Sequence, residues 1–314
     1  MSLEPIVIKG HRSFYKYLKK CGISEEDFNQ PVIIADGVTD CVRLFEGFTS
    51  FNQKIVIPNS VTNCSGMFSG CESFNQEVTI PNSVTNCDRM FWECKSLNQR
   101  IIIPNSVTNC DRMFWKCKSL NQRIIIPNSV TTCEDMFYQC RVLNQEFIIP
   151  ESVKRCDNMF RECYSLNSSV IIPNSVTKCS GMFEDCTSFN QPIILPKGVE
   201  VCVAMFSGCT SFNQNIVISN NVKDCREMFR GCSSFNQSVI IPDTVIFCQH
   251  MFEGCKSLKQ TFMIPQNVTD ATCMFYNSGV NRGDISFDVL NSIVTGDMLF
   301  GESTISSYEP TSLF

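Results

Sequence analysis

The feature that most constrains this chain is a motif, Cys-x-x-Met-Phe-x-x-Cys, that returns with a period of 23 residues. Its phenylalanine recurs without any insertion at Phe45, Phe68, Phe91, Phe114, Phe137, Phe160, Phe183, Phe206, Phe229, Phe252 and Phe275. A fixed period in the twenties is typical of a solenoid, in which no coil can bury its own apolar face and each is covered by its neighbours. We therefore expect an elongated stack of coils rather than a closed globule.

Each repeat divides into a strand and a compact return. In the copy 74–96, the segment before Pro81 alternates, with Val78 and Ile80 facing inward, and the proline ends the strand because it cannot donate to a ladder. The stretch 84–94 then carries apolar residues at spacings of three and four, which favours a short helical or 3₁₀ return. The sequence thus predicts an α/β solenoid, a right-handed stack of about 11 coils with one parallel β-sheet, roughly 50 Å long at about 4.8 Å per coil.

The repeat also divides the chain into three parts. Residues 1–27 form an N-terminal cap, in which the stretch from Ser13 to Lys20 is expected to be an amphipathic helix with Ser13 as its N-cap. Residues 28–280 form the repeat solenoid, and residues 281–314 are interpreted as a degenerate last repeat and a C-terminal cap. Caps are expected because both ends of a parallel sheet expose unpaired strand edges.

The repeats carry a family resemblance. The run from Val61 to Gln76, Val-Thr-Asn-Cys-Ser-Gly-Met-Phe-Ser-Gly-Cys-Glu-Ser-Phe-Asn-Gln, resembles a microbial surface-protein repeat with the core Val-Thr-x-Met-x-x-Met-Phe-x-x-[Ala/Cys]-x-Ser-Phe-Asn-Gln. The Ile-Pro-Asn-Ser-Val segment is similar to the BspA-type leucine-rich repeat. The resemblance implies a leucine-rich-repeat-like fold and a role in binding or adhesion. This chain departs from it in two ways, since cysteine takes a methionine or isoleucine position and Ile-Pro replaces a tryptophan-containing segment.

Charge and motif content exclude several functions. A formal net charge of -5 gives no general attraction to phosphate backbones or anionic membranes, so nucleic acid is not expected as a partner. The aliphatic runs are far shorter than the roughly 20 residues of a membrane-spanning helix, so membrane insertion is not expected. Only His11 and His250 occur, and no phosphate loop, paired catalytic acids or metal motif is present. We expect neither an enzyme nor a cofactor or metal.

The 21 cysteines invite a disulfide or zinc interpretation. All but Cys21 and Cys273 fall into two evenly spaced columns. The first column is Cys41, Cys64, Cys87, Cys110, Cys133, Cys156, Cys179, Cys202, Cys225 and Cys248, and the second is Cys71, Cys94, Cys117, Cys140, Cys163, Cys186, Cys209, Cys232 and Cys255. Side chains of one column point the same way from successive coils, which disfavours disulfides, and no four thiolates converge as zinc requires. We interpret these residues as reduced, buried core fillers.

The free thiols also led to an expectation about the compartment. So many unpaired cysteines indicate folding in a reducing environment, and the N-terminus lacks the basic start and apolar stretch of a secretion signal. The sequence therefore predicts an intracellular protein, or one assembled in a reducing cytoplasm, including a virion-associated one.

Binding specificity in a repeat protein comes from outward positions that vary between copies. The position after Met-Phe is aromatic in three successive repeats, at Trp92, Trp115 and Tyr138. Such clusters anchor protein interfaces or stack on sugar rings, although local packing would also explain them. The segment 88–141 has eight basic and five acidic residues, a net of +3, while the remainder carries -8. Arg100 and Arg123 occupy outward strand positions in this basic segment.

A second variable feature is an apolar stripe. The outward strand position reads Val56, Thr79, Ile102, Ile125, Ile148, Ile171, Ile194, Val217, Ile240 and Met263. If exposed, the stripe would be larger than a monomer usually tolerates and would be an interaction surface. Alternatively, β-branched residues simply favour strands and flanking side chains cover them.

Three functional hypotheses follow. The first is a non-enzymatic scaffold that binds another protein, with a partly acidic and centrally apolar surface, through a candidate site of Trp92, Trp115, Tyr138, Arg100, Arg123, Ile102 and Ile125. The second is a structural subunit of a virion or surface layer, in which copies of the chain bury the stripe. The third is an adhesin that presents the same face to a host protein or glycan.

Overall fold

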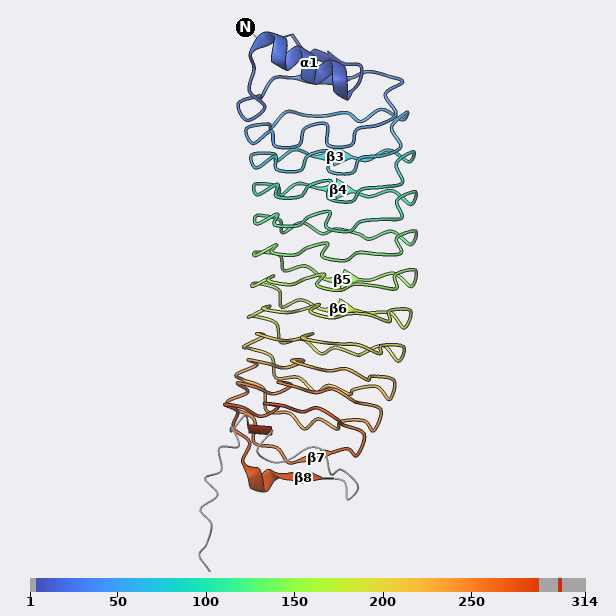
Figure 1. Ribbon diagram of the computed structural model, residues 1–314. Coiled ribbons are helices and arrows are strands. Elements are labelled where there is room, and N and C mark those ends of the chain that lie inside the picture. Colours follow the sequence, from blue (N-terminus) through green and yellow to red (C-terminus); the bar gives the residue numbers. More distant parts are fainter. Residues whose placement is uncertain (1–3, 288–298, 301–314) are drawn as a thin grey trace, which may run out of the picture.

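The structure is a computed structural model that describes residues 4–287 and 299–300. The chain winds into a long stack of similar coils, with the N-terminal helix at one end and the last strand near the other (Figure 1). Each coil is two short walls joined by turns, and the core lies between the walls. The stack confirms the solenoid predicted from the 23-residue period.

The N-terminal cap covers the first coil. Strand β1 (Ile6–Ile8) pairs in parallel with β2 (Val32–Ile34), and α1 (His11–Cys21) connects them across the end of the stack. Phe14 of this helix is buried, with its ring centroid 5.8 Å from that of Phe45 in the first coil. The apolar side of the predicted helix therefore seals the core.

The helix does not start where the sequence suggested. Its N-cap is Gly10, whose carbonyl accepts the amide of Phe14, so Ser13 already lies within the first turn. There the Ser13 hydroxyl donates to the Gly10 carbonyl at 2.7 Å instead of capping a free amide. The prediction of Ser13 as the N-cap was wrong.

The strand wall contains short parallel pairs rather than one regular sheet. Beyond β1 and β2, the pairs are β3 (Val78–Thr79) with β4 (Ile101–Ile102), β5 (Phe147–Ile148) with β6 (Val170–Ile171), and β7 (Phe262–Ile264) with β8 (Ile285–Phe287). Each pair is offset by one repeat. A second series of parallel bridges runs without interruption from Asp40↔Asn63 to Phe247↔Asp270. In most repeats, with Ala35 and Ser219 as exceptions, a proline follows the strand segment and limits regular pairing because it has no amide to donate.

The return is a run of turns and not a helix. In the second coil, the amides of Met67 and Cys71 bond to carbonyls three residues earlier, as in a 3₁₀ turn. Between them, the Phe68 amide donates to the next coil, at 2.9 Å from the Met90 carbonyl. Left-handed residues such as Gly70, at φ 76°, interrupt any continuous helix. The apolar residues at spacings of three and four therefore lie on turns whose amides bond alternately within the coil and to the next coil.

Side-chain ladders complete the core. The repeated phenylalanines from Phe45 to Phe275 are buried and stack with centroids 5.5 to 5.8 Å apart. At the strand start, each asparagine Oδ1 accepts the backbone amide one repeat later, as Asn52 does from Asn75 at 2.9 Å. The asparagine ladder thereby gives these backbone amides a hydrogen-bond partner.

The predicted C-terminal part, 281–314, lies mostly outside the described residues. Within it, a 3₁₀ turn η1 (Arg282–Asp284) leads into β8, and Leu299 is buried with its carbonyl 2.9 Å from the Phe275 amide. The stacking pattern therefore continues past the last full repeat.

Candidate interaction surfaces

The two walls of each coil carry different outward side chains. Phe147 faces inward from the strand wall, and its ring lies 5.0 Å from Phe137 and 4.9 Å from Phe160 on the return. The strand wall and the return therefore oppose each other across the core. We call the outward side chains of the strand wall the strand face, and those of the return the return face. The two faces point away from each other.

The aromatic trio forms a continuous stack on the return face. The Trp92 and Trp115 centroids are 4.6 Å apart, and those of Trp115 and Tyr138 are 4.0 Å apart, with nearly parallel planes. Arg89 lies over the other side of Trp92, and Arg161 over the other side of Tyr138. Trp115 is therefore covered by a ring on both flat sides, and a guanidinium lies over each of the two outer rings.

A partly buried hydrogen-bond cluster fixes one end of the aromatic stack. Glu162 accepts from the hydroxyls of Tyr138 and Tyr164, at 2.7 and 2.8 Å, and from the Gln139 amide. Burial acts to raise the pKa of Glu162, but these hydrogen bonds outweigh it and hold that pKa below its ordinary value. Burial and the bond to Glu162 raise the pKa of Tyr138 to about 12. The trio is thus braced as part of the scaffold.

Among the described residues, half of the eight basic side chains of the segment 88–141 make ion pairs, namely Arg89, Lys95, Arg112 and Lys116. Lys116 pairs with Glu93 at 2.8 Å, and Arg112 with Asp135 at 3.1 Å. Each of these last two ion pairs joins successive coils, so the charges form inter-coil ladders. The net positive charge of the segment is carried by the basic side chains outside these pairs, which include Arg100 and Arg123.

Arg100, Arg123, Ile102 and Ile125 lie on the strand face, opposite the aromatic stack. Both arginines are exposed, and within the described part of the chain neither makes an ion pair or a side-chain hydrogen bond. The predicted site residues therefore divide into two groups on opposite sides of the solenoid. One small ligand cannot contact both groups.

The strand face displays the apolar stripe to solvent. Its residues range from 45% exposed at Ile102 to 87% at Ile194, and Val7 and Ile33 extend the stripe onto the cap. Flanking side chains do not cover it, so of the two alternatives the exposed one holds. A hollow of about 790 Å³ lies between Ile194 and Val217, and one of about 740 Å³ lies beside Val56.

Next to the stripe runs a polar column that our sequence reasoning did not use. Its first five members are charged and its last five are not, in the order Lys54, Glu77, Arg100, Arg123, Glu146, Ser169, Pro192, Asn215, Ser238 and Thr261. We call the two halves of the strand face the charged half and the charge-free half, after the members of this column. Comparing the first outward strand position between repeats would have revealed this division.

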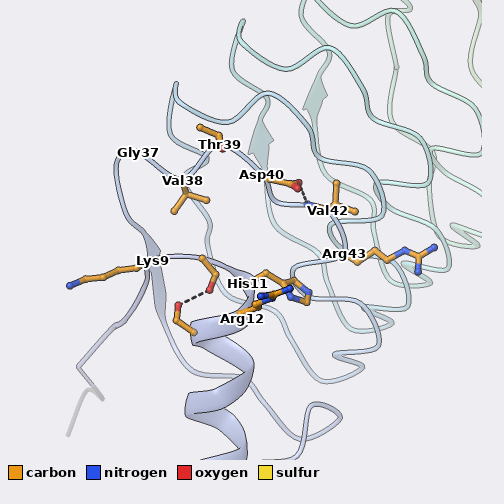
Figure 2. A pocket seen from close by; sticks show the side chains of 11 residues that line it. Lys9, His11, Arg12, Gly37, Val38, Thr39, Asp40, Val42 and Arg43 are labelled. Carbon is orange, nitrogen blue, oxygen red and sulfur yellow. Dashed lines mark hydrogen bonds between the residues drawn. The ribbon is translucent and has the colours of Figure 1, made fainter.

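A basic hollow of about 780 Å³ lies between the cap and the first coil (Figure 2). Lys9, His11 and Arg12 come from the cap, and Asp40 and Arg43 from the first coil. The Asp40 carboxylate already accepts the Val42 amide at 2.9 Å. Among the described residues, no group of three or more His, Cys, Asp or Glu side chains is arranged to hold a metal, and no helix is long and apolar enough to cross a membrane.

The column cysteines are buried and unpaired, as predicted. Each thiol of the second column donates to the phenylalanine carbonyl of the preceding coil, for example Cys163 to Phe137 at 3.1 Å. Burial raises the pKa of every column thiol, that of Cys179 to about 12. These cysteines are therefore protonated packing groups.

The fold defines the chain as a leucine-rich-repeat solenoid. It belongs to the family described as Mycoplasma protein of unknown function, DUF285, whose model matches overlapping segments 24–125, 83–170, 104–194, 126–216, 149–243, 173–264 and 205–308. The BspA-like repeat resemblance is thereby confirmed. No curated protein matches the sequence.

Solved structures share the fold. A leucine-rich repeat protein from Bacteroides ovatus is similar with a TM-score of 0.62 and 22% identity, over 91% of this chain and 77% of that one. A leucine rich cell surface protein from Faecalibacterium prausnitzii is 25% identical, with a TM-score of 0.47, over 73% of this chain and 71% of that one.

The intracellular expectation was wrong. It is contradicted by the family, whose BspA-like repeats point to a surface or extracellular location rather than a cytoplasmic one. The physical reason is that the cysteines do not report on the compartment. In the folded chain a buried, protonated thiol is a poor nucleophile, so the presence of these columns does not by itself require a reducing compartment.

Proposed function

We propose that this chain is a non-enzymatic repeat scaffold that binds another protein through its strand face. The observation that carries the proposal is the exposed apolar stripe, a row of aliphatic side chains along the whole described solenoid. At about 4.8 Å per coil the stripe extends over roughly 50 Å and several hundred Å², a patch size that marks interaction sites. The resemblance to microbial surface-protein repeats supports a place at a cell surface.

The charge-free half of the strand face is the favoured docking region. Ile194, Val217, Ile240 and Met263 project there beside the uncharged members of the polar column. Two charged side chains adjoin this region, Lys197 at the hollow beside Ile194 and Val217, and Asp243 beside Ile240 and Met263. A partner that covers the aliphatic side chains would leave these two charges in water at the rim of the contact. The hollow between Ile194 and Val217 would accept an apolar anchor residue of the kind that dominates protein interfaces. The expected partner is a protein with an uncharged, apolar contact segment.

A glycan is a weaker candidate partner. Sugar rings bind to tryptophan by lying on the flat side of the indole. In the aromatic stack those sides are covered by Arg89, the neighbouring rings and Arg161. If the chain is an adhesin, we expect its ligand to be a protein.

Adding charge to the charge-free half should abolish partner capture. The immobilised wild-type protein would be compared with V217K/I240K for retention of proteins from cell-surface extracts, quantified by mass spectrometry. The matched control is S211K/S234K, which places two lysines at exposed positions of the same two coils, six residues earlier. We expect a partner that wild type and control retain and V217K/I240K loses by about tenfold or more.

Two results would count against this proposal. One is equal retention of every captured protein by V217K/I240K and wild type. The other is loss of the same proteins from the S211K/S234K control, since that would place the contact away from the stripe. Circular dichroism of the three proteins checks that the substitutions leave the solenoid folded.

A further inference from the structure

The charged half of the strand face carries an ordered pattern. Lys54, Glu77, Arg100, Arg123 and Glu146 follow one another in the same outward column, one per coil, with signs plus, minus, plus, plus, minus. All five are exposed, and within the described residues none makes an ion pair or side-chain hydrogen bond. On the return face, by contrast, successive charges bond to each other. The strand-face charges are therefore available to an outside partner.

We propose that the partner of this half is a second copy of the same chain. The copies pack strand face to strand face with their long axes antiparallel, about a two-fold axis that passes through the coil of Arg100. The proposal rests on the strand face being an interaction face. It assigns the charged half, together with the adjoining coils of Ile171 and Ile194, to self-association and leaves the charge-free half from Val217 onward to another protein.

The sign pattern selects this register. With the axis at Arg100, a coil that lies a given number of repeats before Arg100 meets the coil of the second copy that lies the same number of repeats after it. Lys54 therefore faces Glu146, and Glu77 faces Arg123. Two-fold symmetry makes each of these contacts twice. Moving the axis half a repeat, to between Arg100 and Arg123, places these two arginines opposite each other and Glu77 opposite Glu146. Juxtaposed like charges cost several kcal/mol, so that register is disfavoured.

Arg100 meets its own copy at the axis. Its long side chain is exposed and leaves the coil at the polar column, beside the apolar stripe. Such a side chain can lay its aliphatic part along the apolar surface and keep its guanidinium in water. The central like-charge contact is thereby relieved, while the four flanking contacts are of opposite sign.

The apolar stripe is also matched in this register. Ile102 packs on its own copy, Thr79 faces Ile125, and Val56 faces Ile148. Farther out, Ile33 meets Ile171 and the cap residue Val7 meets Ile194, all of them exposed in the single chain.

The overlap covers nine coils, including the cap strand, or roughly 40 Å. At a width of about 15 Å it would bury about 600 Å² per copy, or about 1,200 Å² in total, the lower end of specific protein interfaces. A reversible dimer is therefore expected. Its apolar centre and charged rim also follow the usual anatomy of such interfaces.

Charge reversal tests the register with the purified full chain alone. Sedimentation velocity over a concentration series should show a wild-type monomer–dimer equilibrium. E77R and R123E should each weaken dimerisation by more than about tenfold, because each creates two like-charge contacts. An equimolar mixture of the two variants should restore it, since both contacts between positions 77 and 123 of unlike copies are then of opposite sign.

Apolar substitutions give a matched control. I125K lies inside the predicted overlap and should abolish the dimer, whereas I240K lies outside it and should leave the dimer unchanged. A wild-type chain that stays monomeric at high concentration, a variant mixture that fails to associate, or equal effects of I125K and I240K would each overturn the proposal. Failure of self-association alone, with capture still lost in V217K/I240K, would leave the proposed function standing.

Discussion

Replacing Phe160 with alanine is expected to destabilise the protein by about 3 to 5 kcal/mol. Phe160 is fully buried, and its ring contacts Phe137, Phe147 and Phe183 at centroid distances of 5.6, 4.9 and 5.8 Å. The substitution leaves a cavity that cannot close, because inter-coil hydrogen bonds fix the spacing of the coils on either side. Chemical denaturation would measure the loss, and hydrogen exchange would show which coils loosen.

The matched control is Phe247→Ala. Phe247 is 40% exposed and lies beside the return, so its removal opens no enclosed cavity and should cost less than about 1 kcal/mol. Exchange protection should fall in the coils that flank residue 160 and stay unchanged in those that flank residue 247. Unaltered protection around residue 160 would mean that the phenylalanine column does not hold successive coils together.

Alkylation of the folded protein at neutral pH is expected to modify Cys21 and Cys273 quickly and the column cysteines only on unfolding. Cys21 is exposed and Cys273 is partly exposed, while the column thiols are buried and their pKa values are raised by burial. Reaction requires the thiolate and access to the reagent. Burial raises the pKa of Cys110 to about 12, so little thiolate is present, and it also keeps the reagent away from the sulfur. Mass spectrometry after denaturation without reductant should then find all 21 cysteines alkylated.

The same thiols predict the pH dependence of stability. A thiol whose pKa is higher in the folded chain than in the unfolded chain stabilises the fold fully below the unfolded value, near 9, and that contribution is lost as pH rises toward 12. The free energy of unfolding should therefore fall between about pH 9 and 12. Native disulfides in the mass spectra, or stability that is constant over this range, would contradict the burial of the columns.

The sequence was sufficient for the architecture because the repeat averages out local ambiguity. Each inward position, such as that of Phe160, recurs in many copies, so its burial can be inferred from the column rather than from one residue. The return was harder to predict. Apolar spacings of three and four occur in helices, but here left-handed residues such as Arg89, at φ 53°, divide the segment into turns bonded to the next coil. No local propensity signals a left-handed arginine.

The candidate site was predicted less completely than the fold. Trp92 and Arg100 are eight residues apart, and sequence alone could not establish that a turn of the coil places them on opposite faces. The stacking of Trp115 between Trp92 and Tyr138 could be predicted from the sequence, because residues 23 apart lie on neighbouring coils. The sequence did not indicate that neighbouring rings and arginines lie over the flat ring surfaces that a sugar would contact.

The most direct test of the central claim, that the strand face is the interaction face, is hydroxyl-radical footprinting of the protein free and bound to a captured partner. Met263 and the aliphatic residues Ile194 and Val217 are exposed on that face, and the thioether of methionine oxidises readily. We expect that oxidation of these three side chains falls on binding while that of Trp92 and Trp115 does not change. Protection of the two tryptophans, with unchanged oxidation of Ile194, Val217 and Met263, would contradict it.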